Sequence, residues 1–313
     1  EVEEGTTSNK PSRLFIYHVD TGVNAKETFR RKIDSIAVEF LQGGNPTEPW
    51  RSSGPAVQDY DQEAAYRSIL TYTSRSGNME LRWTIRMKNG DTIRLYQRMA
   101  LSIVPTRHFY SEDVPMNTME DLQALVDQVD GTITADVIVY IHLPAVTYEG
   151  SLVLANRSIN LVGSEGPEGT RTTFTGTLQA IAQKGYICQF KNLDFVGDGG
   201  GAGVSASARI NFTGCHFTRW RTGVLCYGDS WVNMKDCIFE DNTVGFHFNS
   251  SGKNANDHMY SGNLFRHNDT AVLLESVPGD QTLYFDNTRF SRNNADIDNR
   301  CGHEVSITAA IFE

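Results

Sequence analysis

The side chains best suited to acid–base chemistry follow a phenylalanine that recurs through the second half of the chain. They are Arg219, Glu240, Asp241 and His267, with Arg266 beside the last of them. If the repeats stack, opposite charges meet on neighbouring repeats, and a carboxylate beside a base is the arrangement of general acid–base catalysis. A solvated ladder of ion pairs has the same pattern, and the demands of solubility and register favour that interpretation. The four residues stay catalytic candidates.

An aromatic side chain within a basic segment provides a second type of candidate, a ligand-binding site. Trp220 has Arg219, Arg221 and His216 around it, and an aromatic face suits the apolar side of a sugar ring. The alternative is a corner residue that packs on the next repeat. Asp194 and His216 occupy equivalent positions in successive repeats and are of types suited to the same site.

Cysteine usage bears on metals and on oxidation. The five cysteines are Cys188, Cys215, Cys226, Cys237 and Cys301, and none forms a C-x-x-C pair. The usual zinc spacings are therefore absent, no cofactor or metal is predicted, and no motif supports a calcium site. Cys215 and Cys237 fall at the same place in adjacent repeats, which fits either a disulfide or two stacked thiols.

The repeat is defined by seven phenylalanines at gaps of 21, 22, 22, 26, 25 and 22 residues. These landmarks are Phe174, Phe195, Phe217, Phe239, Phe265, Phe290 and Phe312. Other positions keep register with the landmarks and form four further columns. The column five residues before the later landmarks contains Phe190, Phe212, Met234, Tyr260, Phe285 and Ile307, and the column seven residues before them contains Cys188, Ile210, Val232, His258, Leu283 and Val305. The column two residues before the landmarks contains Leu193, Cys215, Cys237, Asn263, Thr288 and Ala310. The column seven residues after the landmarks contains Ala202, Val224, Phe246, Val272 and Ile297.

Apolar and polar residues alternate around these columns, which indicates short strands separated by bends. The bends carry residues typical of sharp corners: Asn192, Gly214, Asp236, Gly262 and Asn287. Three positions after a landmark, Asn242, Asn268 and Asn293 predict an asparagine ladder. Three strands in each unit of about 22 residues describe a coil, and stacked coils pair in parallel. The predicted fold is mainly β, a right-handed parallel β-helix, with His258 as a hydrogen-bonded core histidine.

These repeats, with the segment "DVIVYIHLPAVTYEGSLVLANRSINLVGS" and its "TYEG" turn, resemble the pectin-lyase-like superfamily over roughly residues 136–313. The resemblance implies a β-helix, and its members commonly cleave acidic polysaccharides with calcium-holding carboxylates and a basic residue, or with clustered aspartates. The chain departs from that pattern, because it has no Asp-Asp pair and no Gly-His-Gly.

The preceding residues predict a cap and a separate domain. A helix over about 117–130 would begin at Asn117 or Thr118 and present Leu122, Leu125, Val126 and Val129 to the open end of the β-helix. Residues 1–112 are predicted to be a small α+β domain, with "SEDVPMN" at 111–117 as linker and 113–313 as the β-helix. Within the small domain, Phe29, Ile33, Ile36 and Phe40 predict one helix.

An antiparallel meander is predicted over 66–99, with turns near 76–78 and at Asn89-Gly90. Leu81, Trp83, Ile85 and Met87 would form its buried face and Arg82, Arg86, Arg94 and Arg98 a basic one, which is either an ordinary charged face or a surface for an anionic polymer.

The net charge and the first residue bear on which classes of function the chain can have. The net charge of −10 argues against nucleic acid as a partner, because phosphate binding needs a basic surface. The first residue is Glu1, so a signal or membrane anchor upstream stays possible. The leading hypothesis is an extracellular or cell-surface β-helix that binds a polysaccharide or surface glycan without cleaving it, as an adhesin does. A polysaccharide lyase or glycoside hydrolase, and a structural spacer, are the alternatives.

Overall fold

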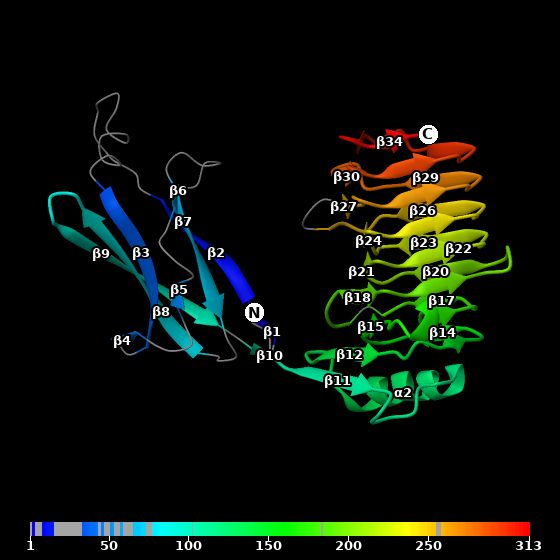
Figure 1. Ribbon diagram of the computed structural model, residues 1–313, viewed down its shortest axis with the longest axis horizontal. Coiled ribbons are helices and arrows are strands. Elements are labelled where there is room, and N and C mark those ends of the chain that lie inside the picture. Colours follow the sequence, from blue (N-terminus) through cyan, green and yellow to red (C-terminus); the bar gives the residue numbers. More distant parts are fainter. Residues whose placement is uncertain are drawn as a thin grey trace. The chain divides into compact units, whose positions relative to one another are not determined.

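The computed structural model describes residues 2–3, 8–15, 33–42, 45–46, 51–52, 57–58, 65–72, 77–101, 103–182, 184–254 and 258–313. The chain divides into two compact units, Glu1–Thr106 and Arg107–Glu313. Figure 1 shows strands in the first unit and a stack of coils in the second. The division falls a few residues before the boundary predicted at 112/113. No helix among these residues is long and apolar enough to cross a membrane.

The described residues of the first unit form three small groups of strands. Its strands are β1 (Val2–Glu3), β2 (Ser8–Phe15), β3 (Ile33–Gln42), β4 (Asn45–Pro46), β5 (Arg51–Ser52), β6 (Val57–Gln58), β7 (Ala65–Tyr72), β8 (Gly77–Met87), β9 (Thr92–Leu101) and β10 (Ile103–Val104). One sheet has the order β4-β3-β8-β9, another β2-β7-β5 with β6 also on β7, and β1 pairs with β10.

The predicted hairpin at Asn89-Gly90 is confirmed, since β8 and β9 pair antiparallel across it and Gly90 has a φ of 93°. Trp83 and Ile85 are buried, as the alternation predicted. The predicted pairing of the first strand of the meander with the second is wrong. Strand β7 pairs with β2, and β3 lies beside β8 instead. The register puts Arg82, Arg86 and Arg94 on one face of the β8–β9 pair.

The helix predicted from Phe29, Ile33, Ile36 and Phe40 is wrong over the part that the structure describes. Residues Ile33–Gln42 form β3, which pairs antiparallel with β8. Ile36, Val38 and Phe40 also alternate with polar or small residues, so the segment fits a period of 2 as well as a helical one. Its β-branched content and the partner strand favour the extended form.

The cap at the start of the second unit is confirmed. Helix α2 spans Met119–Thr132, and the Thr118 hydroxyl accepts a hydrogen bond from the Asp121 amide. Its buried residues are the four predicted: Leu122, Leu125, Val126 and Val129. Within the predicted linker 111–117, Met116 is fully buried and its carbonyl accepts a hydrogen bond from the Tyr148 hydroxyl, so this end of the segment packs against the β-helix.

Three columns of strands form the β-helix, which confirms the predicted fold. The first sheet has the order β11 (Thr106–Tyr110), β12 (Ile138–His142), β15 (Asn160–Val162), β18 (Cys188–Lys191), β21 (Ile210–Thr213) and β24 (Val232–Lys235). In the later coils, the corresponding strands form a separate three-stranded sheet of β27 (His258–Met259), β30 (Leu283–Tyr284) and β33 (Val305–Ser306). The second sheet has the order β13 (Thr147–Tyr148), β16 (Thr173–Phe174), β19 (Asp194–Val196), β22 (His216–Thr218), β25 (Ile238–Glu240), β28 (Leu264–Arg266), β31 (Arg289–Ser291) and β34 (Ile311–Phe312). The third has β14 (Leu152–Leu154), β17 (Leu178–Ala180), β20 (Ala202–Ala206), β23 (Thr222–Gly228), β26 (Val244–Ser250), β29 (Thr270–Ser276) and β32 (Ala295–Asn299). A short 3-10 turn, η1 (Pro167–Gly169), interrupts an early coil.

The landmark phenylalanines form one continuous interior column. Each pairs in register with the next, from Phe174 to Phe312, and successive ring centroids are 4.5–5.4 Å apart. Two details of the alignment differ. Ile307 is 45% exposed because it lies in the last coil, which has no further coil above it in this structure. Val204, not Ala202, pairs with Val224, because the glycine-rich segment at 197–203 adds residues to its coil.

The predicted corners and the asparagine ladder are both confirmed. Asn192, Gly214, Asp236, Gly262 and Asn287 all have positive φ values, between 54° and 72°. In the ladder, the Asn242 amide donates to the Asn268 side-chain oxygen at 3.0 Å, and the Asn268 amide donates to that of Asn293 at 2.9 Å. These amides close one corner of successive coils and satisfy backbone groups that would otherwise be buried without partners.

All five cysteines are free thiols, so Cys215 and Cys237 are stacked thiols and not a disulfide. Burial raises the pKa of the Cys188 thiol to about 11 and that of Cys226 to about 12. Both therefore stay protonated and pack as small apolar groups. The side chain of His258, predicted to be a core histidine, lies outside the described residues.

Candidate functional site

Strands of the second sheet place their central phenylalanines inside the coil, so the residues on either side of each phenylalanine point outward. Six charged or titratable side chains gather on and beside this outer face, and we call them the charged strip: Arg171, Asp194, His216, Glu240, Arg266 and His267. They come from consecutive coils, so the strip follows the long axis of the β-helix.

One half of the strip is built around Asp194. Arg171 donates from Nε to Asp194 Oδ1 at 2.8 Å, and His216 Nδ1 lies 3.3 Å from the same oxygen. Arg171 also donates to the Gly214 carbonyl and pairs with Glu165 at 3.3 Å. One guanidinium thus links three coils and holds the carboxylate in place, and the carboxylate orients the imidazole.

The other half is built around Glu240. Arg266 Nη2 donates a hydrogen bond to Glu240 Oε2 at 2.8 Å, and Nε lies 2.7 Å from Oε1, so the guanidinium contacts both carboxylate oxygens. His267 Nδ1 lies 3.9 Å from Glu240 and 3.8 Å from Asp241. The hydrogen bond and the charge of Glu240 raise the pKa of Arg266 further above its ordinary value.

Charged groups from both halves of the charged strip affect the pKa of His216. Burial lowers the pKa of this imidazole, and the positive charges of Arg171 and Arg266 lower it further. The carboxylates of Asp194 and Glu240 act in the opposite direction but do not outweigh burial. A neutral imidazole with a carboxylate on one ring nitrogen can accept a proton on the other, so the chemistry that this arrangement can perform is that of a general base.

Three of the residues predicted from sequence stand at a second corner of the coil. Arg219, Asp241 and His267 have φ values of 58°, 56° and 56°. Asp241 and His267 are neighbours, as predicted, and Glu240 pairs with Arg266. Among the residues that the structure describes, no ion pair joins Arg219 to Asp241, so that predicted contact does not form.

Trp220 does not lie on the surface and is not available as a sugar-stacking platform. It is 3% exposed, and added Cβ atoms at Gly197 and Gly203 would lie only 2.6 Å and 3.1 Å from the indole. The indole therefore packs on backbone of the preceding coil, which only glycine permits. Arg219 and Arg221, on either side of it, are exposed. His216 lies in the charged strip.

Sequence reasoning missed Arg171, which precedes β16 in a coil where the corner pattern is interrupted by η1.

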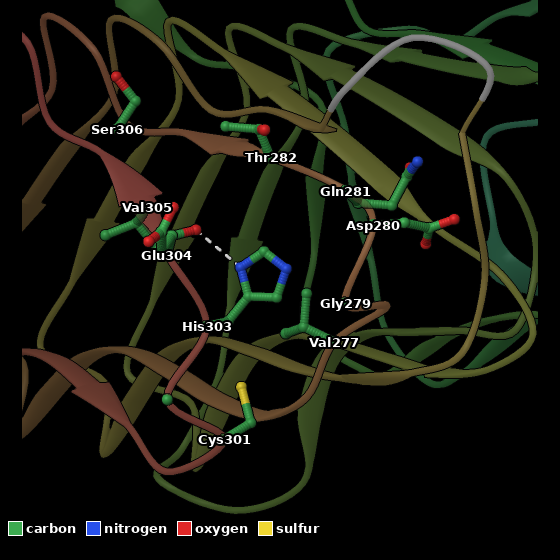
Figure 2. Close-up of a pocket in the computed structure, with 11 residues that line it drawn as sticks. Val277, Gly279, Asp280, Gln281, Thr282, Cys301, His303, Glu304, Val305 and Ser306 are labelled. Carbon is green, nitrogen blue, oxygen red and sulfur yellow. Dashed lines mark hydrogen bonds between the residues drawn. The ribbon is translucent and has the colours of Figure 1, made fainter.

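Sequence reasoning also missed a cavity of about 810 Å³ beside the last coils (Figure 2). That cavity is lined by Val277, Gly279, Asp280, Gln281, Thr282, Cys301, Gly302, His303, Glu304, Val305 and Ser306. His303 spans its wall, because its ring nitrogens lie 2.7 Å from the Glu304 carbonyl and 2.9 Å from the Pro278 carbonyl. Within the described ranges, no group of three or more His, Cys, Asp or Glu side chains could hold a metal ion.

Comparison with known proteins gives weak similarities. No protein-family model matches the chain, and no curated protein matches it. A family 28 exopolygalacturonase from Yersinia enterocolitica is 11% identical, with a TM-score of 0.26 over 95% of this chain and 79% of that one. A 2,6-sialyltransferase from Photobacterium sp. JT-ISH-224 is 8% identical, with a TM-score of 0.17 over 63% of this chain and 41% of that one. Similarities this weak do not bear on function, which therefore rests on the chain's own residues.

Proposed function

We propose that this chain is an exported or cell-surface protein that binds an acidic polysaccharide along the charged strip without cleaving it. The observation that carries the proposal is the alignment of Arg171, His216, Arg266 and His267 along the outer face of one parallel sheet. A linear polymer that lies along the axis meets a new coil every ~4.8 Å, so it contacts several of these side chains at once.

The charges of the strip suit such a ligand. The side chains of Arg171 and Arg266 are 19% and 42% exposed, and a carboxylate holds each of them in position. Fixed arginines lose little conformational entropy on binding, and a guanidinium pairs with a carboxylate in two hydrogen bonds. Successive coils thus present preorganised donors to an anionic chain.

The first test is binding by Arg266→Ala, measured by calorimetry against polygalacturonate and a neutral glucan. Affinity for the acidic polymer is expected to fall by about tenfold to a hundredfold, and salt is expected to weaken the parent's binding. Arg300→Ala is the matched control, because Arg300 is also exposed and paired with a neighbouring aspartate, Asp298, but lies just after a strand of the third sheet. Equal losses in both variants would contradict the site.

A second candidate is a polysaccharide lyase, and the observation that favours it is the neutral His216 held by Asp194 between two arginines. A base that removes the proton next to a uronate carboxylate needs a cation beside that carboxylate, and Arg171 or Arg266 is suited to that role.

The two candidates differ in what His216→Gln does. The lyase requires that this variant lose turnover, followed by ultraviolet absorbance of unsaturated uronides, while affinity changes by less than about threefold. If the parent releases no product from acidic or neutral polysaccharides, with or without calcium, the lyase is excluded and the binding proposal stands. Neither binding nor cleavage would favour a structural spacer.

A further inference from the structure

The first strand of the β-helix unit has an unusual place in the chain. β11 (Thr106–Tyr110) begins where the two compact units divide, and it forms the edge of the first sheet beside β12. An edge strand has a partner on one side only, so its attachment depends on few contacts. Anything that weakens the β11–β12 pair frees the segment that connects the two units.

Four rings on the outer face of β11 and β12 supply such contacts. His108 stacks on Tyr140 with ring centroids 5.0 Å apart and planes within 5°, and Tyr110 stacks on His142 at 4.4 Å and 8°. His108 Nδ1 and His142 Nε2 are 3.0 Å apart, which is hydrogen-bond distance. The centroids of the two imidazoles are 5.3 Å apart with planes within 20°. This geometry fits an N–H···N bond that joins the two strands.

Such a bond exists only while one of the two facing nitrogens lacks a proton. When both imidazoles are protonated, two donors and two positive charges face each other. We propose that His108 and His142 form a pH-sensitive clasp that holds β11 on β12 when at least one ring is neutral and releases it when both are charged.

The surroundings of His142 oppose its protonation. Beside Tyr140 and His142, the next strand, β15, places Asn160 and Val162, neither of which titrates. After Val162 in the row comes Lys191 of β18, a cation, and the stacking partners Tyr110 and Tyr140 are phenols rather than carboxylates. Arg107, next to His108 on β11, is a second basic residue. Burial and the charge of His108 lower the pKa of His142.

The direction of the pH dependence follows from that shift. A histidine whose folded pKa is lowered stabilises the folded arrangement above its unfolded pKa of about 6.5, and that contribution is lost as the pH falls through the folded pKa. Release is therefore expected in mildly acidic conditions. Release would leave the five residues of β11 as unattached chain with a contour length of about 17 Å, at ~3.3 Å per extended residue.

Hydrogen exchange of the full chain, read by mass spectrometry as protection factors at pH 7 and pH 5, tests the clasp. Protection of the amides in β11 is expected to fall at least about tenfold at pH 5, because each unit of pH below the folded pKa changes a one-proton equilibrium tenfold. Protection in α2 and β15 is expected to stay unchanged. Equal protection of β11 at both pH values would overturn the proposal.

Variants separate the clasp from general acid sensitivity. His142→Gln and His108→Gln each leave one titratable ring, so both are expected to remove most of the pH response of β11. The control is His247→Gln, since His247 pairs with Glu275 on the third sheet, and this variant is expected to keep the response. A response of β11 that persists in both clasp variants would also overturn the proposal, even if one of them is less stable than the parent.

Discussion

Replacing Phe239 by alanine is expected to lower the free energy of unfolding of the β-helix by about 3–5 kcal/mol. Phe239 is fully buried and stacks between Phe217 and Phe265, with ring centroids at 4.8 Å and 4.5 Å. The hole left by the ring cannot collapse, because backbone hydrogen bonds hold the coils above and below at a fixed spacing. Urea denaturation followed by circular dichroism measures the change.

Phe312→Ala is the matched control, because Phe312 belongs to the same column but is 47% exposed in the last coil. It stacks on Phe290 alone among the rings that the structure describes, at 5.0 Å, so its loss is expected to cost much less. If Phe239→Ala is no more destabilising than Phe312→Ala, the column does not carry the stability of the fold.

Asn268→Ala is expected to cost about 2–4 kcal/mol, the second-largest effect, because removal of one side chain leaves several buried polar groups without partners. The Asn268 side-chain oxygen accepts bonds from the Asn242 backbone at 3.1 Å and from its side chain at 3.0 Å. Its amide donates to the Phe239 carbonyl at 3.0 Å and to Asn293 at 2.9 Å. The site is closed to bulk solvent, since Asn268 is 1% exposed.

The neighbouring residue Asn294 provides the comparison for this effect. It is exposed, and its side chain makes one bond to Asp269, at 3.0 Å. Asn294→Ala is expected to change the unfolding free energy by less than about 0.5 kcal/mol. Thermal or urea unfolding of Asn268→Ala and Asn294→Ala compares their unfolding midpoints. Similar midpoints would mean that solvent replaces the hydrogen bonds of the ladder without loss of stability.

The coil architecture was predictable because each coil places the same requirements on residue type at equivalent positions. An apolar residue must enter the bore at the landmark, and a residue that tolerates positive φ must stand at the corner. Phe239 meets the first requirement and Asp236, with a φ of 55°, meets the second, and both follow from spacing and residue type. The error at Ala202 arose where 197–203 changes the length of one coil, and only the strand register reveals that Val204 takes the place.

The first unit was less predictable because its segments lack a repeat. Ile33–Gln42 fits two periodicities, and what decides between them is the strand that pairs with it, β8, which comes far later in the chain. The same reason explains why β7 pairs with β2 rather than with β8. Local pattern sets which segments can be extended, whereas pairing depends on all the strands that compete for the same edge.

The amino-acid sequence alone determined that charges of opposite sign would meet on stacked coils, as Glu240 and Arg266 do. It did so because neighbours across a parallel sheet are set by the repeat length. Only the tertiary structure decided that Trp220 is covered, that Arg171 reaches Asp194 from an irregular coil, and that His108 meets His142. These contacts join positions that no common spacing relates, so they depend on how backbone and rings pack in three dimensions.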